Sequence, residues 1–89
     1  NNERYNLVED LTKNIFDSEA ILFAENRKES PEDLMVSNEI IKEIATEIYK
    51  DTKDFSDTQL FDYLDQEDVY KMIRKEFLGY LVDQGIEIL

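Results

Sequence analysis

The closing quarter of the chain carries apolar residues at helical spacing together with signals for both ends of a helix. These apolar residues recur every three or four positions and therefore share one face: Val69, Met72, Ile73, Phe77, Tyr80 and Leu81. Asp65 and Asp68 have the pattern of a capping box at the start of this helix. At the other end, Gly85 suits the left-handed residue of a Schellman motif, which would bring Ile86 into contact with Leu81. A helix with one apolar face needs other elements to cover that face, so this stretch predicts a packed helical fold.

The first third of the chain predicts a long helix over residues 4–26. Its apolar face is wide, which indicates contact with two other elements: Leu7, Val8, Leu11, Ile15, Phe16, Ile21, Leu22 and Phe23. A charged break follows at residues 25–29. Ser30 and Pro31 then indicate a new and short helix, because proline is tolerated at the first helical position, where its missing N–H is not needed.

Two more helices are expected before the closing one. Ser37 is a candidate cap for a helix that ends near Lys50, with apolar residues again three and four apart: Ile40, Ile41, Ile44, Ala45, Ile48 and Tyr49. Ser56 and Gln59 form a second capping-box pattern. The short helix that follows would bury three apolar residues: Leu60, Phe61 and Leu64. The sequence therefore predicts an all-α bundle of three main helices plus one or two short ones, in a single domain over residues 1–89.

Two residue types bear on how tightly this bundle packs. Aromatic residues on the apolar faces are core candidates first and pocket candidates second: Phe16, Phe23, Tyr49, Phe61, Phe77 and Tyr80. Gly79 lies in the middle of the closing helix, where glycine costs about 1 kcal/mol relative to alanine. We interpret this glycine as a point where another helix approaches closely.

The composition argues against catalysis, cofactors and metal sites. Histidine and cysteine are both absent, which removes the commonest general base and the strongest metal ligands. Aspartates at every third position from Asp51 could suggest calcium, but Lys53 and Phe55 occupy positions where an EF-hand loop requires oxygen ligands. We interpret these acids as helix-start charges, with weak divalent-ion binding as the alternative. The chain is therefore expected not to be an enzyme.

The net charge of −12 limits the partners of the chain. It would repel the phosphates of nucleic acids and of anionic membranes, so no direct contact with either is expected. No apolar run approaches the roughly 20 residues that cross a bilayer. A basic protein partner is compatible with this charge, and the sequence leaves the oligomeric state open.

Two sets of residues are candidates for partner binding. Glu39, Glu43 and Glu47 form a row at i, i+4 and i+8 on one helix, which would meet a basic partner. The alternative is that this row pairs inside the fold with the densest basic patch of the chain, formed by Lys71, Arg74 and Lys75, or that it simply stays solvated. The second set lies at the end of the chain: Ile86, Ile88 and Leu89. Because the chain lacks an initial methionine and stops on these apolar residues, we expect it to be a piece of a longer protein.

Residues 42–49 and 76–89 resemble the C-terminal helical domain of centrosomal and cortical microtubule-associated proteins. The connection between the two segments is much shorter here. The resemblance implies a scaffold role at centrosomes, basal bodies or microtubule arrays, a cytoplasmic and cytoskeleton-associated location, and no catalytic residues. It also implies a closing helix that continues through Gly85, contrary to the cap described above.

These observations lead to two functional hypotheses. The first is a non-enzymatic helical domain for protein–protein interaction within a larger assembly, such as a cytoskeletal or centrosomal scaffold. The alternative is an acidic inhibitor whose carboxylates imitate nucleic-acid phosphates for a DNA- or RNA-handling enzyme. Affinity that falls steeply with salt would favour the second hypothesis.

Overall fold

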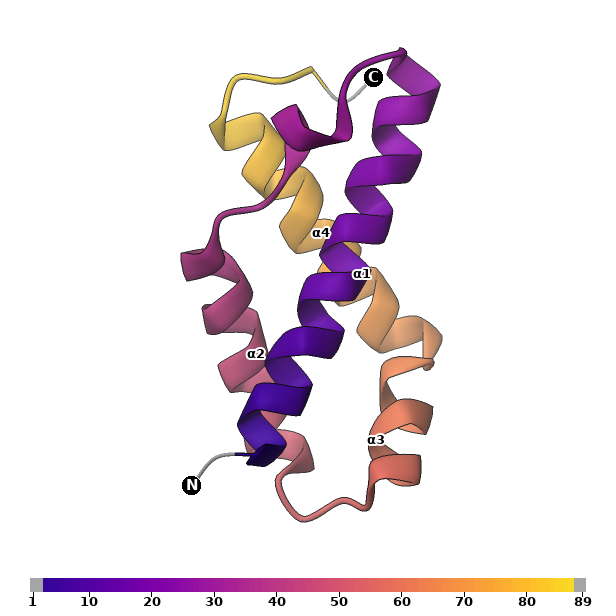
Figure 1. The fold of residues 1–89 in the computed structure, drawn as a ribbon, viewed down its shortest axis with the longest axis vertical. Coiled ribbons are helices and arrows are strands. Elements are labelled where there is room, and N and C mark those ends of the chain that lie inside the picture. The colour runs from indigo at the N-terminus through magenta and orange to yellow at the C-terminus, as the bar shows by residue number, and fades with distance from the viewer. Residues whose placement is uncertain (1–2, 88–89) are drawn as a thin grey trace.

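The computed structural model describes residues 3–87, and helices account for most of them (Figure 1). In chain order the elements are α1 (Glu3–Arg27), the 3₁₀ helix η1 (Pro31–Leu34), α2 (Asn38–Thr52), α3 (Asp57–Leu64) and α4 (Glu67–Asp83). Residues 3–87 contain no strand. The predicted all-α bundle is confirmed, with α1, α2 and α4 as the main helices and η1 and α3 as the short ones.

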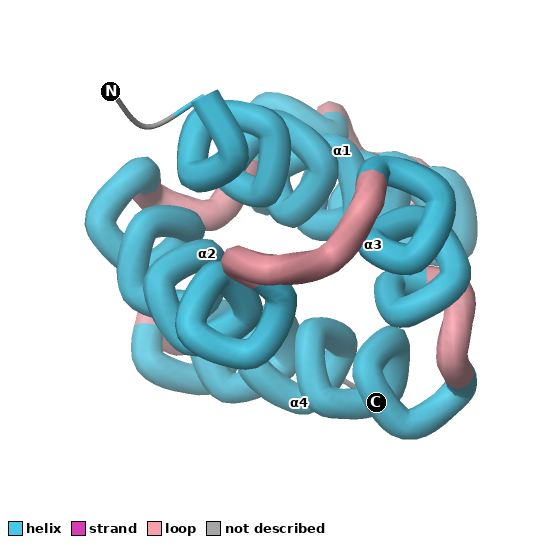
Figure 2. The backbone as a smooth tube through the Cα atoms, turned by 90° about the horizontal axis from the view of Figure 1, so that it is seen from below, coloured by secondary structure: helices cyan, strands magenta, loops and turns pink. Residues whose placement is uncertain are grey.

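The long helix α1 is the element against which the others pack. Figure 1 shows α2 alongside the N-terminal half of α1, and α4 crossing α1 behind its centre. The short helix η1 contacts α1 as well, and α3 contacts α4. Seen from below, the four α-helices surround a common interior (Figure 2). The closing helix therefore covers its apolar face with earlier elements, as the sequence predicts.

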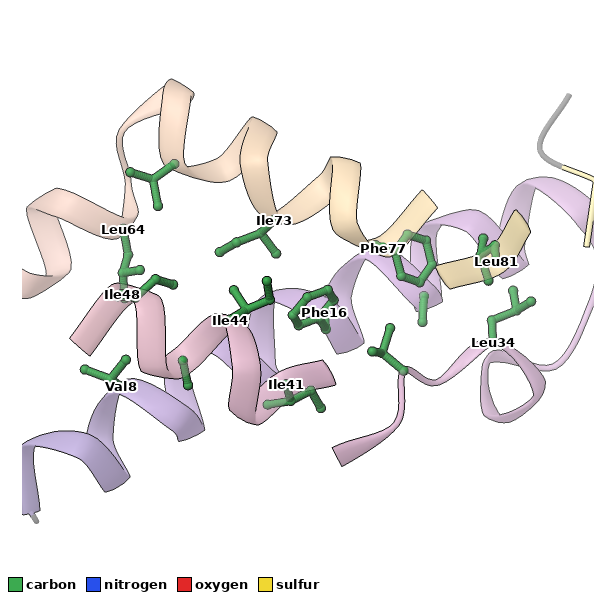
Figure 3. Packing of buried hydrophobic residues seen from close by; sticks show 14 of the residues in the cluster. Val8, Phe16, Leu34, Ile41, Ile44, Ile48, Leu64, Ile73, Phe77 and Leu81 are labelled. Carbon is green, nitrogen blue, oxygen red and sulfur yellow. The ribbon is translucent and has the colours of Figure 1, made fainter. Parts of the chain in front are cut away.

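The core lies where α1, α2 and α4 meet. Phe16 of α1, Ile44 of α2 and Ile73 of α4 point into the space between the three helices (Figure 3). Other side chains of the same cluster extend it toward α3 and η1: Val8, Leu34, Ile41, Ile48, Leu60, Leu64, Phe77 and Leu81. Burial of these side chains is the main favourable contribution to folding, at roughly 1.5–3 kcal/mol for each large one.

The buried face of α1 differs in its centre from the predicted one. Five fully buried residues, four positions apart, form this centre: Val8, Thr12, Phe16, Ala20 and Ala24. Two residues predicted on the apolar face, Ile21 and Leu22, are 43% and 53% exposed. Because alanine is small, neighbouring elements can pack closely against Ala20 and Ala24. The buried face of α1 is therefore centred on this side of the helix. The prediction for Ile21 and Leu22 is therefore wrong.

Two threonines are buried in this core without a polar partner on another helix. The Thr12 hydroxyl donates to the Val8 carbonyl at 2.7 Å, and the Thr52 hydroxyl donates to the Ile48 carbonyl at 2.8 Å. Each bond stays within its own helix and satisfies the hydroxyl locally. Thr52 also shows that α2 extends two residues beyond Lys50, where the sequence suggests its end.

The helix starts agree with the sequence in part. Ser56 and Gln59 form the predicted capping box: the Gln59 N–H donates to Ser56 Oγ at 3.2 Å, and the Ser56 N–H donates to Gln59 Oε1 at 2.9 Å. Ser30 and Ser37 occupy N-cap positions, but neither side chain makes a cap hydrogen bond. The predicted cap at Asp65 is wrong, since this residue ends α3 by donating its N–H to the Phe61 carbonyl.

The end of α4 confirms the predicted Schellman motif. Gly85 has a φ of 78°, the left-handed value that favours glycine. The Ile86 N–H donates to the Leu81 carbonyl, and the Gly85 N–H donates to the Val82 carbonyl, both at 2.9 Å. Ile86 is half-buried and packs against the core. The helix therefore stops at Asp83, and the continuation through Gly85 that the resemblance implies does not occur.

Gly79 has a different environment from the one predicted. A Cβ built on this residue would meet no atom within 4 Å, and the residue is exposed. No other helix approaches α4 at this point, so our interpretation of Gly79 as a close-contact position is wrong. The glycine lowers the helix propensity of α4 without any packing benefit among residues 3–87.

A candidate protein-binding groove between α1 and α4

A hollow of about 310 Å³ opens on the surface beside the middle of α1. Leu11, Ile15 and Ser18 of α1 form one wall. Phe61 and Leu64 of α3, together with Tyr70 of α4, form the other. The lining is mainly apolar, because α1 turns the flank of its buried face toward the junction of α3 and α4.

A second hollow, of about 220 Å³, lies farther along α1. Its walls are Glu19, Leu22 and Phe23 of α1 and Tyr70, Arg74 and Phe77 of α4. Tyr70 lines both hollows, so they adjoin at this side chain. We refer to the two hollows together as the α1–α4 groove. The groove follows α1 from Leu11 to Asn26, a distance of about 22 Å at the rise of an α-helix.

The floor of the second hollow is held by an aromatic contact between the two helices. The rings of Phe23 and Phe77 lie edge to face, with centroids 6.1 Å apart and planes at 76°. Phe77 is fully buried, and Phe23 is half-buried with the Arg27 guanidinium 5.3 Å above its ring. This contact joins α1 to α4 at the second hollow, which both rings line.

Two large apolar side chains of the groove remain exposed to solvent. Phe61 is 45% exposed in the first hollow, and Leu22 is 53% exposed in the second. The prediction of Phe61 as a core residue is therefore wrong. The eight-residue helix α3 directs Leu60 and Leu64 into the core, and Phe61 follows Leu60 at about 100° around the helix axis, on its flank.

Glu19 is the only acidic residue among residues 3–87 that is buried, with 5% of its surface exposed. It lies at the second hollow beside the Tyr70 hydroxyl, and this proximity raises the pKa of Tyr70. Hydrogen bonding of the phenol proton to the Glu19 carboxylate is the main cause, followed by burial and the negative charge of Glu19, with Arg74 acting in the opposite direction.

Sequence reasoning missed Glu19, although a signal was present. The residue lies three positions after Phe16 and four before Phe23, so it interrupts the apolar face of a helix with a charge. An acid in such a place is rarely buried unless it has a partner or a function. The groove itself has no counterpart in the sequence pattern, because it depends on how α4 crosses α1.

The predicted acidic row is exposed, and its internal pairing does not occur. Within residues 3–87, the ion pair of this row joins Glu47 to Lys50 of the same helix at 3.5 Å. Lys71 pairs with Glu67 at 2.9 Å, and neither Arg74 nor Lys75 pairs with the row. Glu43 and Glu47 instead share a hollow with Glu76 of α4, while Glu39 is exposed outside it. The alternative of an internal pair with the basic patch is therefore wrong.

The predicted C-terminal contact residues are only partly described. Ile86 packs against the core, and the Arg27 guanidinium donates to the Glu87 carbonyl, which holds this segment near the end of α1. Ile88 and Leu89 lie outside the described residues. Of the three predicted residues only Ile86 is described, and it packs against the core and does not line the hollow of Glu43 and Glu47.

The carboxylates of the described residues do not converge on a metal site. Among residues 3–87, no group of three or more acidic side chains is placed to hold an ion. Within the same range, no helix combines the length and the apolar character required to cross a membrane. Among the hollows of the described residues, those of the α1–α4 groove contain the exposed apolar side chains of Leu22 and Phe61.

The comparisons with protein-family models, with curated proteins and with solved structures found no match.

Proposed function

We propose that this domain is a non-catalytic protein-interaction module that receives an α-helix of its partner in the α1–α4 groove. The observation that carries the proposal is the exposure of Leu22 and Phe61, one in each of two adjoining hollows, in a chain of net charge −12. Large apolar side chains gathered in a groove favour association, because binding removes them from water. Laying an amphipathic helix into such a groove is a common mode of recognition.

The size of the groove supports a helix as the bound element. A length of about 22 Å accommodates roughly four helical turns, or about 15 residues. The lining residues of both hollows come from helices, with α1 contributing to each of them. The absence of histidine and cysteine from the sequence favours a binding role over catalysis.

The setting of this module is the second part of the proposal. The resemblance of residues 42–49 and 76–89 to the domain of microtubule-associated proteins favours a scaffold in a cytoplasmic, cytoskeleton-associated assembly. In that setting the domain would contact protein partners, and its negative charge disfavours direct contact with nucleic acids or anionic membranes.

A specific observation also favours the alternative hypothesis of nucleic-acid mimicry. Glu43 and Glu47 of α2 and Glu76 of α4 gather at one hollow, away from the α1–α4 groove. In a phosphate mimic these carboxylates would contact a basic cleft, and affinity would fall steeply with salt. Binding through the α1–α4 groove would instead depend on the apolar side chains of Leu22 and Phe61, so their replacement would abolish it.

The test is affinity capture with matched variants of the chain. Leu22→Gln combined with Phe61→Gln removes the exposed apolar side chains of the groove and keeps good helix formers in place. Ile21→Gln is the control, since Ile21 is 43% exposed on the same helix but does not line the groove. We expect partners to be retained by the control and lost by the groove variant.

Other outcomes would contradict the groove as the binding surface. Equal retention by both variants would overturn it. If Glu43→Lys abolished retention of the partner and the groove variant did not, the result would instead support the hypothesis of an acidic inhibitor.

A further inference from the structure

Glu19 occupies an unusual position for a charged residue. Only 5% of its surface is exposed, and it lines the second hollow of the α1–α4 groove. Within residues 3–87, no lysine or arginine nitrogen lies within 4.0 Å of its carboxylate. Buried charges are normally paired, because the loss of hydration is otherwise uncompensated.

The neighbours of Glu19 do not replace a cation. An ionised carboxylate offers about four acceptor positions, and the Tyr70 hydroxyl can occupy one of them. Arg74 lines the same hollow and is exposed, but it makes no ion pair with Glu19. The carboxylate therefore retains acceptor capacity at the point where the hollow opens.

We infer that Glu19 is the specificity-determining residue of the α1–α4 groove, and that it pairs with a lysine or arginine carried by a basic amphipathic helix. The inference rests on the proposed function and names the chemistry of the partner. The apolar residues of the helix would cover Leu22 and Phe61, and its cation would enter the second hollow between them. Arginine suits this position better than lysine, because its planar group matches a carboxylate and is more weakly hydrated.

The charge of the chain separates this partner from a second copy of the same chain. A second copy would bring its own net charge of −12 to the interface and would have to oppose that repulsion. A basic helix brings the opposite charge, which accelerates association and rejects acidic competitors. Charge complementarity thus favours a basic helix as the occupant.

A peptide-display selection on the folded chain tests the inference. The library contains helical peptides of about 16 residues, the length of the groove, with leucines fixed on one face and all other positions random. We expect selected peptides to carry arginine or lysine at one fixed position relative to the leucines. The affinity of such a peptide is then measured against the wild-type chain and three variants: Glu19→Gln, Glu43→Gln and Arg74→Gln.

The variants separate a specific pair from general attraction. Glu19→Gln should weaken binding at least about 10-fold, because the peptide cation loses its buried partner. Glu43→Gln removes the same charge from an exposed site outside the groove and should change affinity by less than about twofold. Arg74→Gln should leave affinity unchanged or raise it, because a like charge beside the peptide cation is removed.

The remaining outcomes overturn the inference or the proposed function separately. Peptides without a fixed cation, or equal losses on Glu19→Gln and Glu43→Gln, would overturn the role of Glu19 and leave the groove intact. Peptides that bind the Leu22→Gln, Phe61→Gln chain normally, or no selected peptides at all, would overturn the groove itself. A thermal melt of Glu19→Gln that matches the wild type excludes unfolding as the cause of lost affinity.

Discussion

The hydroxyl of Tyr70 on α4 lies beside the buried carboxylate of Glu19 on α1, and the pKa of Tyr70 is raised as a result. This contact joins two helices at the point where the two hollows of the α1–α4 groove meet. It therefore connects the stability of the bundle with the shape and charge of its candidate binding surface.

The first prediction concerns the titration of Tyr70. In the Glu19→Gln chain the pKa of Tyr70 should fall toward its ordinary value, because both the hydrogen bonding to the carboxylate and the negative charge are removed. Ring carbon shifts of Tyr70 measured by NMR across alkaline pH would give this value for each chain. An unchanged pKa would show that burial, and not Glu19, dominates the environment of Tyr70.

The second prediction concerns stability at alkaline pH. Tyr63 and Tyr70 both have raised pKa values in the fold, Tyr63 through burial and the nearby Asp51. A group whose pKa is raised on folding stabilises the fold below its unfolded pKa, here about 10. That contribution to stability is lost as the pH rises from about 10 through the pKa of the tyrosine in the folded state. Denaturant unfolding should therefore show a smaller alkaline loss for Tyr63→Phe combined with Tyr70→Phe than for the wild type.

The third prediction uses the two glycines, for which opposite effects are expected. Gly79→Ala should stabilise the domain by about 1 kcal/mol, since the helix propensity rises and the new methyl group meets no atom within 4 Å. For a domain of this size that corresponds to an increase in Tm of roughly 4–8 °C. Gly85→Ala should destabilise it by about 1 kcal/mol, because its φ of 78° is strained for alanine. Changes in Tm of the same sign for the two variants would contradict at least one of the two assignments.

The fourth prediction separates core from groove with two phenylalanines. Phe16→Ala should destabilise the domain by about 3–5 kcal/mol, because Phe16 is fully buried among α1, α2 and α4. Phe61→Ala should cost much less, about 1 kcal/mol, because Phe61 is 45% exposed and lies outside the core cluster. Urea unfolding of the two variants checks this difference. A large loss for Phe61→Ala would place this residue in the core after all.

The fifth prediction compares two serines at N-cap positions. Ser56→Ala should cost about 1 kcal/mol, because it removes the capping box at the start of α3. Ser37→Ala should cost less than about 0.5 kcal/mol, since the Ser37 side chain makes no cap hydrogen bond. Thermal unfolding of the two variants provides the comparison, and equal losses would indicate that Ser37 caps α2 in solution.

The sequence predicted most of the local structure, because the signals involved are local. The spacing of apolar residues predicted α1, α2 and α4, and the Gly85 cap and the Ser56 capping box were correct at the level of single hydrogen bonds. The start of α4 was misplaced because α3 and α4 follow each other so closely that Asp65 ends one helix instead of starting the next.

The candidate site could not be predicted, because it depends on tertiary packing. The centre of the buried face of α1 contains Ala20 and Ala24, which carry little weight in a hydrophobic pattern, while the larger Leu22 lies outside it. The orientation of α1 is decided by the elements that pack against these alanines. Once α1 is turned in this way, Leu22 and Glu19 come to line the groove. The sequence alone indicated one feature of the site, namely that Glu19 places a charge on an apolar helix face.

The buried hydroxyls of Thr12 and Thr52 have a consequence for how the helices are aligned. Since each donates to a carbonyl of its own helix, neither provides a directional bond that would resist sliding of one helix along its neighbour. The alignment of α1 with α2 therefore depends on packing, which includes the edge-to-face contact of the Tyr5 and Tyr49 rings, with centroids 5.8 Å apart. The contact between Glu19 and Tyr70 differs from these two hydroxyls, because it is a polar contact between two helices. It forms at only one position of α4 along the axis of α1. A change at either residue would thus alter both the alignment of this helix pair and what the adjoining surface can accept.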